Sequence, residues 1–355
     1  MADTTRPSLR EYGIAIGELP AGPVNAITDV AGVAVGHAGL SDGPVQTGCT
    51  AVRLHDGHPF REKLPAAVHI VNGFGKSVGL TQINELGTVE TPIMLTNTLS
   101  VGTAATALVR HMLERTPEIG EATGTVNPVV LECNDGAWLN DIRGLHVQER
   151  HVREALDAVG ATVTEGNVGA GTGMSCYGLA GGIGTASRVV PVKRRHHVIG
   201  ALTLCNMGRL RDLRIDGRPV GVSIASRLGA ERDSRDQGSI IVLIATDAPL
   251  DARQLRRLAV RAAGGIARTG SHFGSGSGDI VLAVSTAERI PHTPPADPVT
   301  TRRILHEEAL DPLFRAVIES TEEAILNALL AARPRTGKHG NTRRALSEFA
   351  DLLGP

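Results

Sequence analysis

Short apolar runs alternate with amphipathic, helix-like stretches along most of this chain. Strand-length apolar runs predict buried strands at residues 30–35, 67–71, 129–132, 198–204, 240–245 and 280–285. Apolar residues at helical spacing predict helices at residues 99–115, 151–159, 249–266 and 311–330. The last two ranges carry a proline at their start, a residue favoured in the first turn of a helix. Strands and helices mixed in this order predict sheets covered by helices, an α/β or α+β layered fold.

Glycine, proline and charge mark the connections between these elements. The 42 glycines are spread along the chain, which indicates many tight turns between short strands. Residues 227–237 are polar and charged, and residues 291–298 are rich in proline, so we expect both to be exposed loops. No repeat of fixed period is present, and the length of 355 residues allows either two domains or one large layered domain.

The composition is that of a globular protein with an aliphatic core. Apolar residues make up 41% of the chain, charged residues 21% and aromatic residues only 2%. The net charge of −1 provides no field that would attract nucleic acid or an anionic membrane. Few aromatic rings are available to stack on bases. We therefore expect neither nucleic acid nor a membrane as a partner.

The sequence gives no sign of a metal centre or of export. Adjacent His196 and His197 would point to opposite faces of a strand, and His146 and His151 have a poor helical spacing for one ion. The N-terminal residues lack a secretion signal, and no apolar run is long enough to span a membrane. We expect a cytoplasmic protein without metal or cofactor. The cysteines lack zinc-site spacing and are expected to be reduced, mostly buried thiols: Cys49, Cys133, Cys176 and Cys205.

The main candidate for chemistry is Ser239, which follows Gly238 and opens the apolar run 240–245. If the Gly238–Ser239 bond is cut, Ser239 gains an α-amine with a reference pKa of about 7.7–8.0, which can accept the hydroxyl proton near neutral pH. Glycine before the serine leaves space for the hydroxyl to attack the preceding carbonyl. A Gly-Ser step before a strand is also ordinary turn chemistry, so these residues alone leave self-processing open. Other Gly-Ser steps lie in the glycine-serine run 270–277, which makes Ser239 the preferred candidate.

Polar side chains follow two of the predicted strands. Glu132 ends the run 129–132, where it is placed to meet a cation, and Asn134 offers an amide nearby. Asn206 follows the run 198–204, and its side-chain N–H could stabilise an oxyanion, although an ordinary turn residue fits equally well. The remaining polar residues of the first cluster are expected only to cap a turn and start a helix: Asp135, Asn140 and Asp141.

Glycine-rich stretches supply the last candidates. Ser277 and Asp279 alternate before the run 280–285, so both could project from one face and orient the α-amine of Ser239. A phosphate-binding loop is the competing interpretation, but no Gly-Lys-Ser/Thr ending is present and a strand follows. The stretch 166–187 lacks the glycine spacing of a dinucleotide-binding loop and is predicted to form a pocket wall or a turn.

Several longer motifs occur in a fixed order. They lie at residues 25–30, 32–37, 91–98, 132–136, 166–174, 238–242, 245–249 and 277–279. Together they resemble the DmpA-type aminopeptidases, the self-processing L-aminopeptidase/D-esterase and β-aminopeptidase family. The resemblance extends from about residue 13 to residue 330 and covers most of the chain.

This resemblance implies a fold, an assembly and a processing event. The fold would be a single αββα domain over residues 1–355, similar to the sandwich of N-terminal-nucleophile hydrolases but with its own connectivity. The precursor would cleave itself into an α chain, 1–238, and a β chain, 239–355. The cleaved protein would form a homo-oligomer, usually a tetramer.

The resemblance also implies a role for each candidate residue. Ser239 would be the nucleophile, Ser277 and Asp279 would assist it, and Asn206 would stabilise the oxyanion. Glu132 would bind the free amino group of the substrate. Asn134 would lie beside that pocket. The substrates would be short peptides, aminoacyl amides or esters that lose their N-terminal residue.

The chain departs from the family pattern in a few places. Many members carry glutamate where this chain has Asp279, some carry tyrosine at Asn134, and one extra residue separates Gly136 from Leu139. These differences bear on substrate preference, which the sequence leaves open among L-α, D-α and β-amino residues. Two other functions remain alternatives: an N-acyl transferase of the ornithine acetyltransferase type, which usually relies on threonine, and a non-catalytic protein that binds amines through Glu132.

Overall fold

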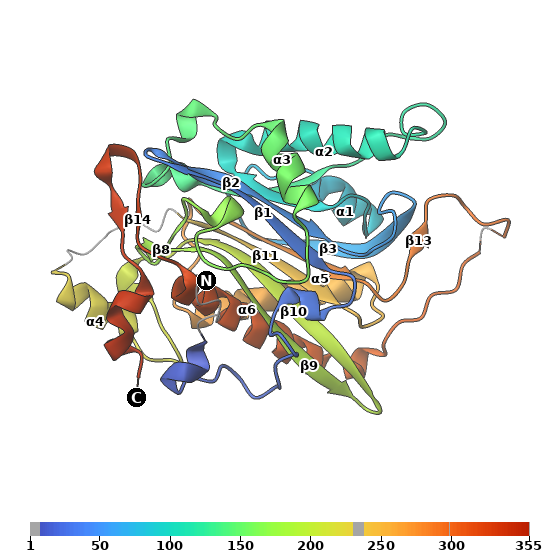
Figure 1. The fold of residues 1–355 in the computed structure, drawn as a ribbon. Helices are drawn as coiled ribbons and strands as arrows, with labels where there is room; N and C mark the ends of the chain where they lie inside the picture. Colours follow the sequence, from blue (N-terminus) through green and yellow to red (C-terminus); the bar gives the residue numbers. More distant parts are fainter. Residues whose placement is uncertain (1–7, 230–237, 298, 355) are drawn as a thin grey trace.

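Two stacked β-sheets form the centre of the molecule, and helices cover their outer faces (Figure 1). The computed structural model describes residues 8–229, 238–297 and 299–354. Three separate groups of buried apolar side chains fill the spaces between the layers. The order of layers is therefore helix, sheet, sheet, helix, which confirms the predicted αββα arrangement.

The first sheet lies under a pair of helices. Within the described residues its strand order is β1-β2-β5-β6, with β5 and β6 parallel and the other pairs antiparallel. Helices α2 (Val101–Arg115) and α3 (Glu149–Asp157) cover it. The strands are β1 (Ala34–Asp42), β2 (Val45–Arg53), β5 (Ile93–Asn97) and β6 (Val129–Cys133).

The second sheet is larger and carries the candidate nucleophile on a central strand. Its order is β13-β3-β12-β11-β10-β9, and β11 pairs in parallel with β12 and antiparallel with β10. Helices α5 (Ala252–Arg268) and α6 (Asp311–Ala331) cover its outer face. The strands are β3 (Glu62–Gly73), β9 (Gly182–Val192), β10 (Arg195–Asn206), β11 (Ser239–Thr246), β12 (Gly278–Ser285) and β13 (Ile290–Pro291), and β4 (Thr88–Val89) pairs with β3.

Smaller elements connect these layers. Four of them form two short hairpins, β7 with β8 and β14 with β15. Their bounds, with those of the two remaining α-helices, are α1 (Leu80–Leu86), β7 (Ser175–Cys176), β8 (Leu179–Ala180), α4 (Val220–Arg227), β14 (Arg335–Thr336) and β15 (Thr342–Arg343).

Strand β11 shows why the central runs are uniformly apolar. Alternate side chains point to opposite faces of a strand. Ile240 and Val242 pack among the side chains under α5 and α6, whereas Ile241 and Leu243 pack between the two sheets. Because both faces are covered, an apolar residue is needed at every position of the strand.

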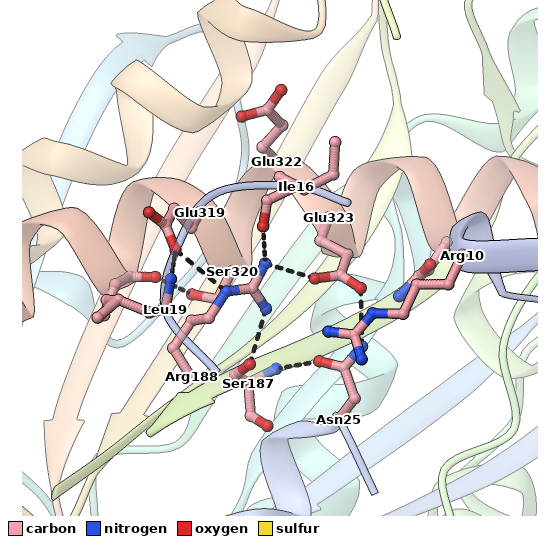
Figure 2. Close-up of polar contacts among 12 residues, drawn as sticks. Arg10, Ile16, Leu19, Asn25, Ser187, Arg188, Glu319, Ser320, Glu322 and Glu323 are labelled. Carbon is pink, nitrogen blue, oxygen red and sulfur yellow. Dashed lines mark hydrogen bonds and ion pairs between the residues drawn. The ribbon is translucent and has the colours of Figure 1, made fainter. Parts of the chain in front are cut away.

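Helix α6 is buried almost throughout and brings charge into the interior. The guanidinium of Arg188, on β9, lies 3.2 Å from a carboxylate oxygen of Glu319 and 2.5 Å from one of Glu323 (Figure 2). Arg188 also donates to the carbonyl oxygen of Ile16 at 2.6 Å. This buried ion cluster fastens the N-terminal segment and β9 to α6, since each unpaired charge would be costly in such a site.

Most predicted elements are confirmed, with corrections at their ends. The strand predicted at 30–35 begins only at Ala34, because Gly32, at φ +86°, belongs to a turn. The helix predicted at 249–266 begins at Ala252 rather than with proline in its first turn, and the side chain of Asp251 caps it. The predicted loop 291–298 begins one residue late, because Pro291 belongs to β13, and its residues 293–297 are exposed. In the predicted loop 227–237, Arg227 instead ends α4, and residues 230–237 lie outside the described residues.

The remaining expectations concern cysteines, metals and membranes. All four cysteines are free and buried, as predicted. Within residues 8–229, 238–297 and 299–354, no cluster of His, Cys, Asp and Glu has the arrangement of a metal site. Over the same residues, every helix falls short of the length and apolarity that crossing a bilayer requires.

Candidate active site

Ser239 is the first residue of β11 and lies between two neighbouring strands. Its cross-strand partners are Asn206 at the end of β10 and Gly278 at the start of β12. The hydroxyl oxygen of Ser239 accepts a hydrogen bond from the Gly278 N–H at 3.1 Å. Only 7% of the residue is exposed. The predicted nucleophile is therefore held by a rigid sheet at the point where three strands meet.

Ser277 and Asp279 lie together on β12 and just before it. The Ser277 hydroxyl donates to Asp279 Oδ1 at 2.5 Å, and the same oxygen accepts the Ile240 N–H at 3.2 Å. Both side chains are buried. The alternation seen in the sequence thus places a serine–carboxylate pair against the residue that follows Ser239.

The side chain of Asn206 is fixed by two hydrogen bonds. Its Oδ1 accepts from the Ser175 N–H at 2.9 Å, and its Nδ2 donates to the Asn134 carbonyl oxygen at 2.9 Å. Asn134 therefore reaches Asn206 through its backbone. The exposed Asn134 side chain instead caps the following turn by accepting from the Gly136 N–H.

Glu132 lies on the opposite side of Ser239 from Asn206. Only 2% of the residue is exposed, and its carboxylate accepts hydrogen bonds from the Lys76 N–H, at 2.7 Å, and from the Thr98 hydroxyl. A Cβ built on Gly75 would lie 3.4 Å from Glu132 Oε1, and one built on Gly278 would lie 2.8 Å from the Gly75 α-carbon and 3.3 Å from the Ser239 hydroxyl oxygen. Two glycines in contact thus separate the carboxylate from the nucleophile.

Gly238 is pressed against the end of β10. A Cβ at this position would lie 2.2 Å from the Asn206 carbonyl oxygen and 2.3 Å from the Met207 α-carbon. No larger residue fits there without displacing backbone. Glycine before Ser239 is therefore a steric requirement of the uncut chain, in addition to the space for the attacking hydroxyl that the sequence suggested.

Several residues that build the site were not identified from sequence. Thr98 and the Lys76 N–H hold the Glu132 carboxylate, and Gly75 provides the close approach to Gly278. Asn72 donates to the carbonyl oxygens of Gly274 and Ser277 and so fixes the loop before β12. The Gly-Phe-Gly step that ends β3 was the available signal, since a glycine beyond a strand often marks a close backbone approach.

The neighbouring carboxylates differ from the simple turn caps that were expected. Asn134, not Asp135, caps the turn, and Asp135 is buried beside Asn140, whose Nδ2 donates to it at 2.9 Å. Burial raises the pKa of Asp135 to about 7. Asp141 lies at the start of the next turn and faces His146 at 3.1 Å. The predicted turn caps are therefore corrected for Asp135 and Asn140, which form part of the interior.

The chain matches the model of peptidase family S58 over residues 25–343. It belongs to this family. The beta-peptidyl aminopeptidase BapA of Sphingosinicella microcystinivorans is 38% identical over 97% of this chain and 91% of the relative. A solved structure from Pyrococcus horikoshii OT3 has a TM-score of 0.92 at 47% identity, with 98% of each chain covered.

A third relative connects the fold to a class of enzyme. The L-aminopeptidase D-Ala-esterase/amidase of Ochrobactrum anthropi, described as a prototype for the serine aminopeptidases and a variant of the Ntn hydrolase fold, has a TM-score of 0.89 at 38% identity, with 98% of each chain covered. The resemblance to the DmpA-type family and the layered fold are thus confirmed. This chain is a serine-type hydrolase with aminopeptidase relatives.

Proposed function

We propose that this protein is a self-processing serine aminopeptidase that releases the N-terminal residue of short peptides, amides or esters through an acyl-enzyme. One observation carries the proposal. The Ser239 hydroxyl lies beside the Gly278 N–H, with the Ser277–Asp279 pair behind it and the Glu132 carboxylate across Gly75 and Gly278. A nucleophile, a proton-handling pair and an acceptor for a cation therefore converge on one strand end.

Processing begins with Ser239 attacking the carbonyl carbon of Gly238. The bond from Ser239 oxygen to that carbon forms, the peptide C–N bond breaks, and the nitrogen takes up the hydroxyl proton. Water then hydrolyses the resulting ester and leaves a carboxylate on Gly238 and a free α-amine on Ser239. The single αββα domain would then consist of chains 1–238 and 239–355, which stay paired through β10 and β11. The assembly proposed for this two-chain unit is a homotetramer.

Catalysis then uses the new amine as its base. The α-amine accepts the Ser239 hydroxyl proton as the oxygen attacks the substrate carbonyl, and returns it to the leaving group. The Ser277–Asp279 pair orients the amine, because Asp279 already lies against the backbone N–H that follows Ser239. An N–H of the Asn206 side chain stabilises the oxyanion, and water attacks the acyl-enzyme with the same amine as base.

Glu132 restricts the enzyme to the chain end of its substrate. Its buried carboxylate is held by one donor on each oxygen, and a buried carboxylate favours a cation as its partner. A substrate α-ammonium is such a cation, whereas an internal peptide group is not. Charge pairing at this position therefore places the first peptide bond, and no later one, over Ser239.

Denaturing mass spectrometry of the purified protein tests the proposal. The wild type should give two fragments that meet between residues 238 and 239, and Ser239→Ala should give one species of 37.1 kDa without turnover of an aminoacyl p-nitroanilide. Ser275→Ala, on an exposed serine of the neighbouring loop, should be processed normally. An uncut wild-type chain with full activity would refute the mechanism.

A further inference from the structure

We propose that Arg343 binds the C-terminal carboxylate of a dipeptide substrate, so that free dipeptides are the preferred substrate class of this site. The inference deepens the proposed function and rests on it. It concerns the side of Ser239 that receives the leaving group. Of the candidate residues from the sequence, Asn206 and Asn134, whose carbonyl oxygen accepts a hydrogen bond from Asn206, lie on that side.

The sheet defines two sides of the nucleophile. Strand β12 flanks β11 on one side and β10 flanks it on the other. Glu132 approaches from the β12 side, through Gly75 and Gly278, whereas Asn206 ends β10. A substrate whose ammonium group lies at Glu132 and whose carbonyl lies over Ser239 must therefore extend its leaving residue toward the β10 side.

A chain of hydrogen bonds leads from that side to Arg343. Asn206 Oδ1 accepts the Ser175 N–H at 2.9 Å, and the Ser175 hydroxyl oxygen accepts the Arg343 Nε–H at 3.0 Å. Ser175 opens β7 and Arg343 ends β15, so both positions are set by short hairpins. The guanidinium thus lies two hydrogen-bonded steps from the residue proposed to hold the oxyanion.

The Arg343 guanidinium is held in place by its neighbours, and the residue as a whole is half-buried. It lies over the ring of Trp138, 4.3 Å from the ring centroid, and donates to the Gly178 carbonyl oxygen at 3.3 Å. The Trp138 indole N–H donates to the Thr342 carbonyl oxygen at 3.2 Å, which fixes the ring, and 38% of Trp138 is exposed. A planar cation fixed on an exposed aromatic ring loses little freedom when it binds a ligand.

The chemistry of the leaving residue matches this position. In a dipeptide, the carboxylate follows the scissile nitrogen by a single α-carbon. Arginine binds carboxylates with two parallel hydrogen bonds, which gives both strength and direction. Lys338, whose ammonium contacts the Gly136 carbonyl oxygen on the same turn as Trp138, adds positive charge nearby. A zwitterionic dipeptide would therefore pair its ammonium group with Glu132 and its carboxylate with Arg343.

Matched substrates test the inference on the processed enzyme. The kcat/KM of a dipeptide with a free carboxylate is compared with that of the same dipeptide amide, for the wild type, Arg343→Met and Arg343→Lys. We expect the wild type to favour the free acid by about tenfold or more through KM, since a hydrogen-bonded ion pair typically contributes this much. Arg343→Met should lose that preference, so its kcat/KM should fall by about tenfold more on the free acid than on the amide, and Arg343→Lys should recover part of the preference.

The neighbouring arginine provides the control. Arg344→Met removes a guanidinium that contacts Glu348 and should behave as the wild type. An aminoacyl p-nitroanilide, which has no carboxylate, reports the proposed function separately. Turnover of this substrate by a wild type that shows no preference for the free acid would overturn the role of Arg343 alone. Absence of turnover together with an uncut chain would overturn the proposed function itself. An Arg343→Met enzyme that keeps the full preference would also refute the inference.

Discussion

The carbonyl oxygen of Asn206 occupies the space that a side chain on Gly238 would need, at 2.2 Å from an ideal Cβ. The methyl group added by Gly238→Ala must therefore push the start of β11 away from the end of β10. We expect this variant to lose roughly 1–3 kcal/mol of stability, as overpacked sites do, and to cleave itself more slowly. The fraction of uncut chain over time, measured by denaturing electrophoresis, checks the prediction.

A second glycine-to-alanine substitution, at a position with free space, controls for the change of residue type alone. Gly102 lies in the first turn of α2, and an added Cβ there meets no atom within 4 Å. Gly102→Ala should be processed at the wild-type rate and be slightly more stable, because alanine favours the helix. Equal processing rates for the two variants would show that the contact with Asn206 does not limit cleavage.

The Glu132 carboxylate is expected to recognise charge rather than shape. Glu132→Gln keeps the size of the side chain and an acceptor for the Lys76 N–H, but removes the charge that a substrate ammonium would meet. We expect kcat/KM on a free-amine substrate to fall by roughly 10²–10³, the cost of leaving a buried charge unpaired. Steady-state kinetics on the free-amine substrate and its N-acetylated form provide the test. Turnover of the acetylated form by the wild type at the same rate would exclude this role.

Much of the site could be predicted because its residues follow recognisable strands. Ser239, Ser277 and Asp279 each adjoin an apolar run, and period-two alternation alone placed the last two on one face. Local patterns of this kind depend on residues close in sequence. Such patterns also predict sheets covered by helices, because apolar runs alternate with amphipathic helices, whereas the order helix, sheet, sheet, helix came only from the resemblance to the family.

The residues that sequence reasoning missed depend on contacts between distant segments. Thr98 meets Glu132 only because β5 and β6 are parallel neighbours, and Gly75 meets Gly278 only because β3 pairs with β12. Neither pairing is encoded by a local pattern. The burial of Asp135 was missed for the same reason, since an acidic residue after a strand is more often a turn former than part of the interior.

Asp279 is hydrogen-bonded both to Ile240, on the strand of the nucleophile, and to Ser277. A substitution that removes only its negative charge tests its role. Asp279→Asn keeps an acceptor for the Ile240 N–H and the Ser277 hydroxyl but no longer stabilises a positive charge on the Ser239 α-amine. We expect kcat to fall by roughly 10²–10⁴, the usual contribution of a proton-transfer group, with KM changed only a few-fold. Ser277→Ala should cause a smaller loss, because Asp279 keeps its bond to Ile240. A large rise in KM with unchanged kcat would instead place Asp279 in substrate binding.

Asp135 should make the protein less stable as pH rises. Its folded pKa is about 7 against a reference value of 3.8, so between these values the folded state holds a proton that the unfolded state releases. This contribution to the free energy of unfolding is fully present below pH 3.8 and is lost as pH rises through about 7. Asp135→Asn imitates the protonated group and should exceed the wild type in stability by a few kcal/mol at pH 8, on the order of the pKa difference, and by much less near pH 4.

Urea unfolding of the wild type and Asp135→Asn at these two pH values measures the difference. His37, whose pKa burial lowers from 6.5 to about 4, acts in the opposite direction, since its contribution is lost as pH falls; it is present in both proteins and cancels. Asp141→Asn alters an exposed carboxylate on the same loop and should change stability by less than about 0.5 kcal/mol at either pH. If the wild type is as stable as Asp135→Asn at pH 8, the carboxylate must be solvated or paired in solution, and the buried arrangement with Asn140 is wrong.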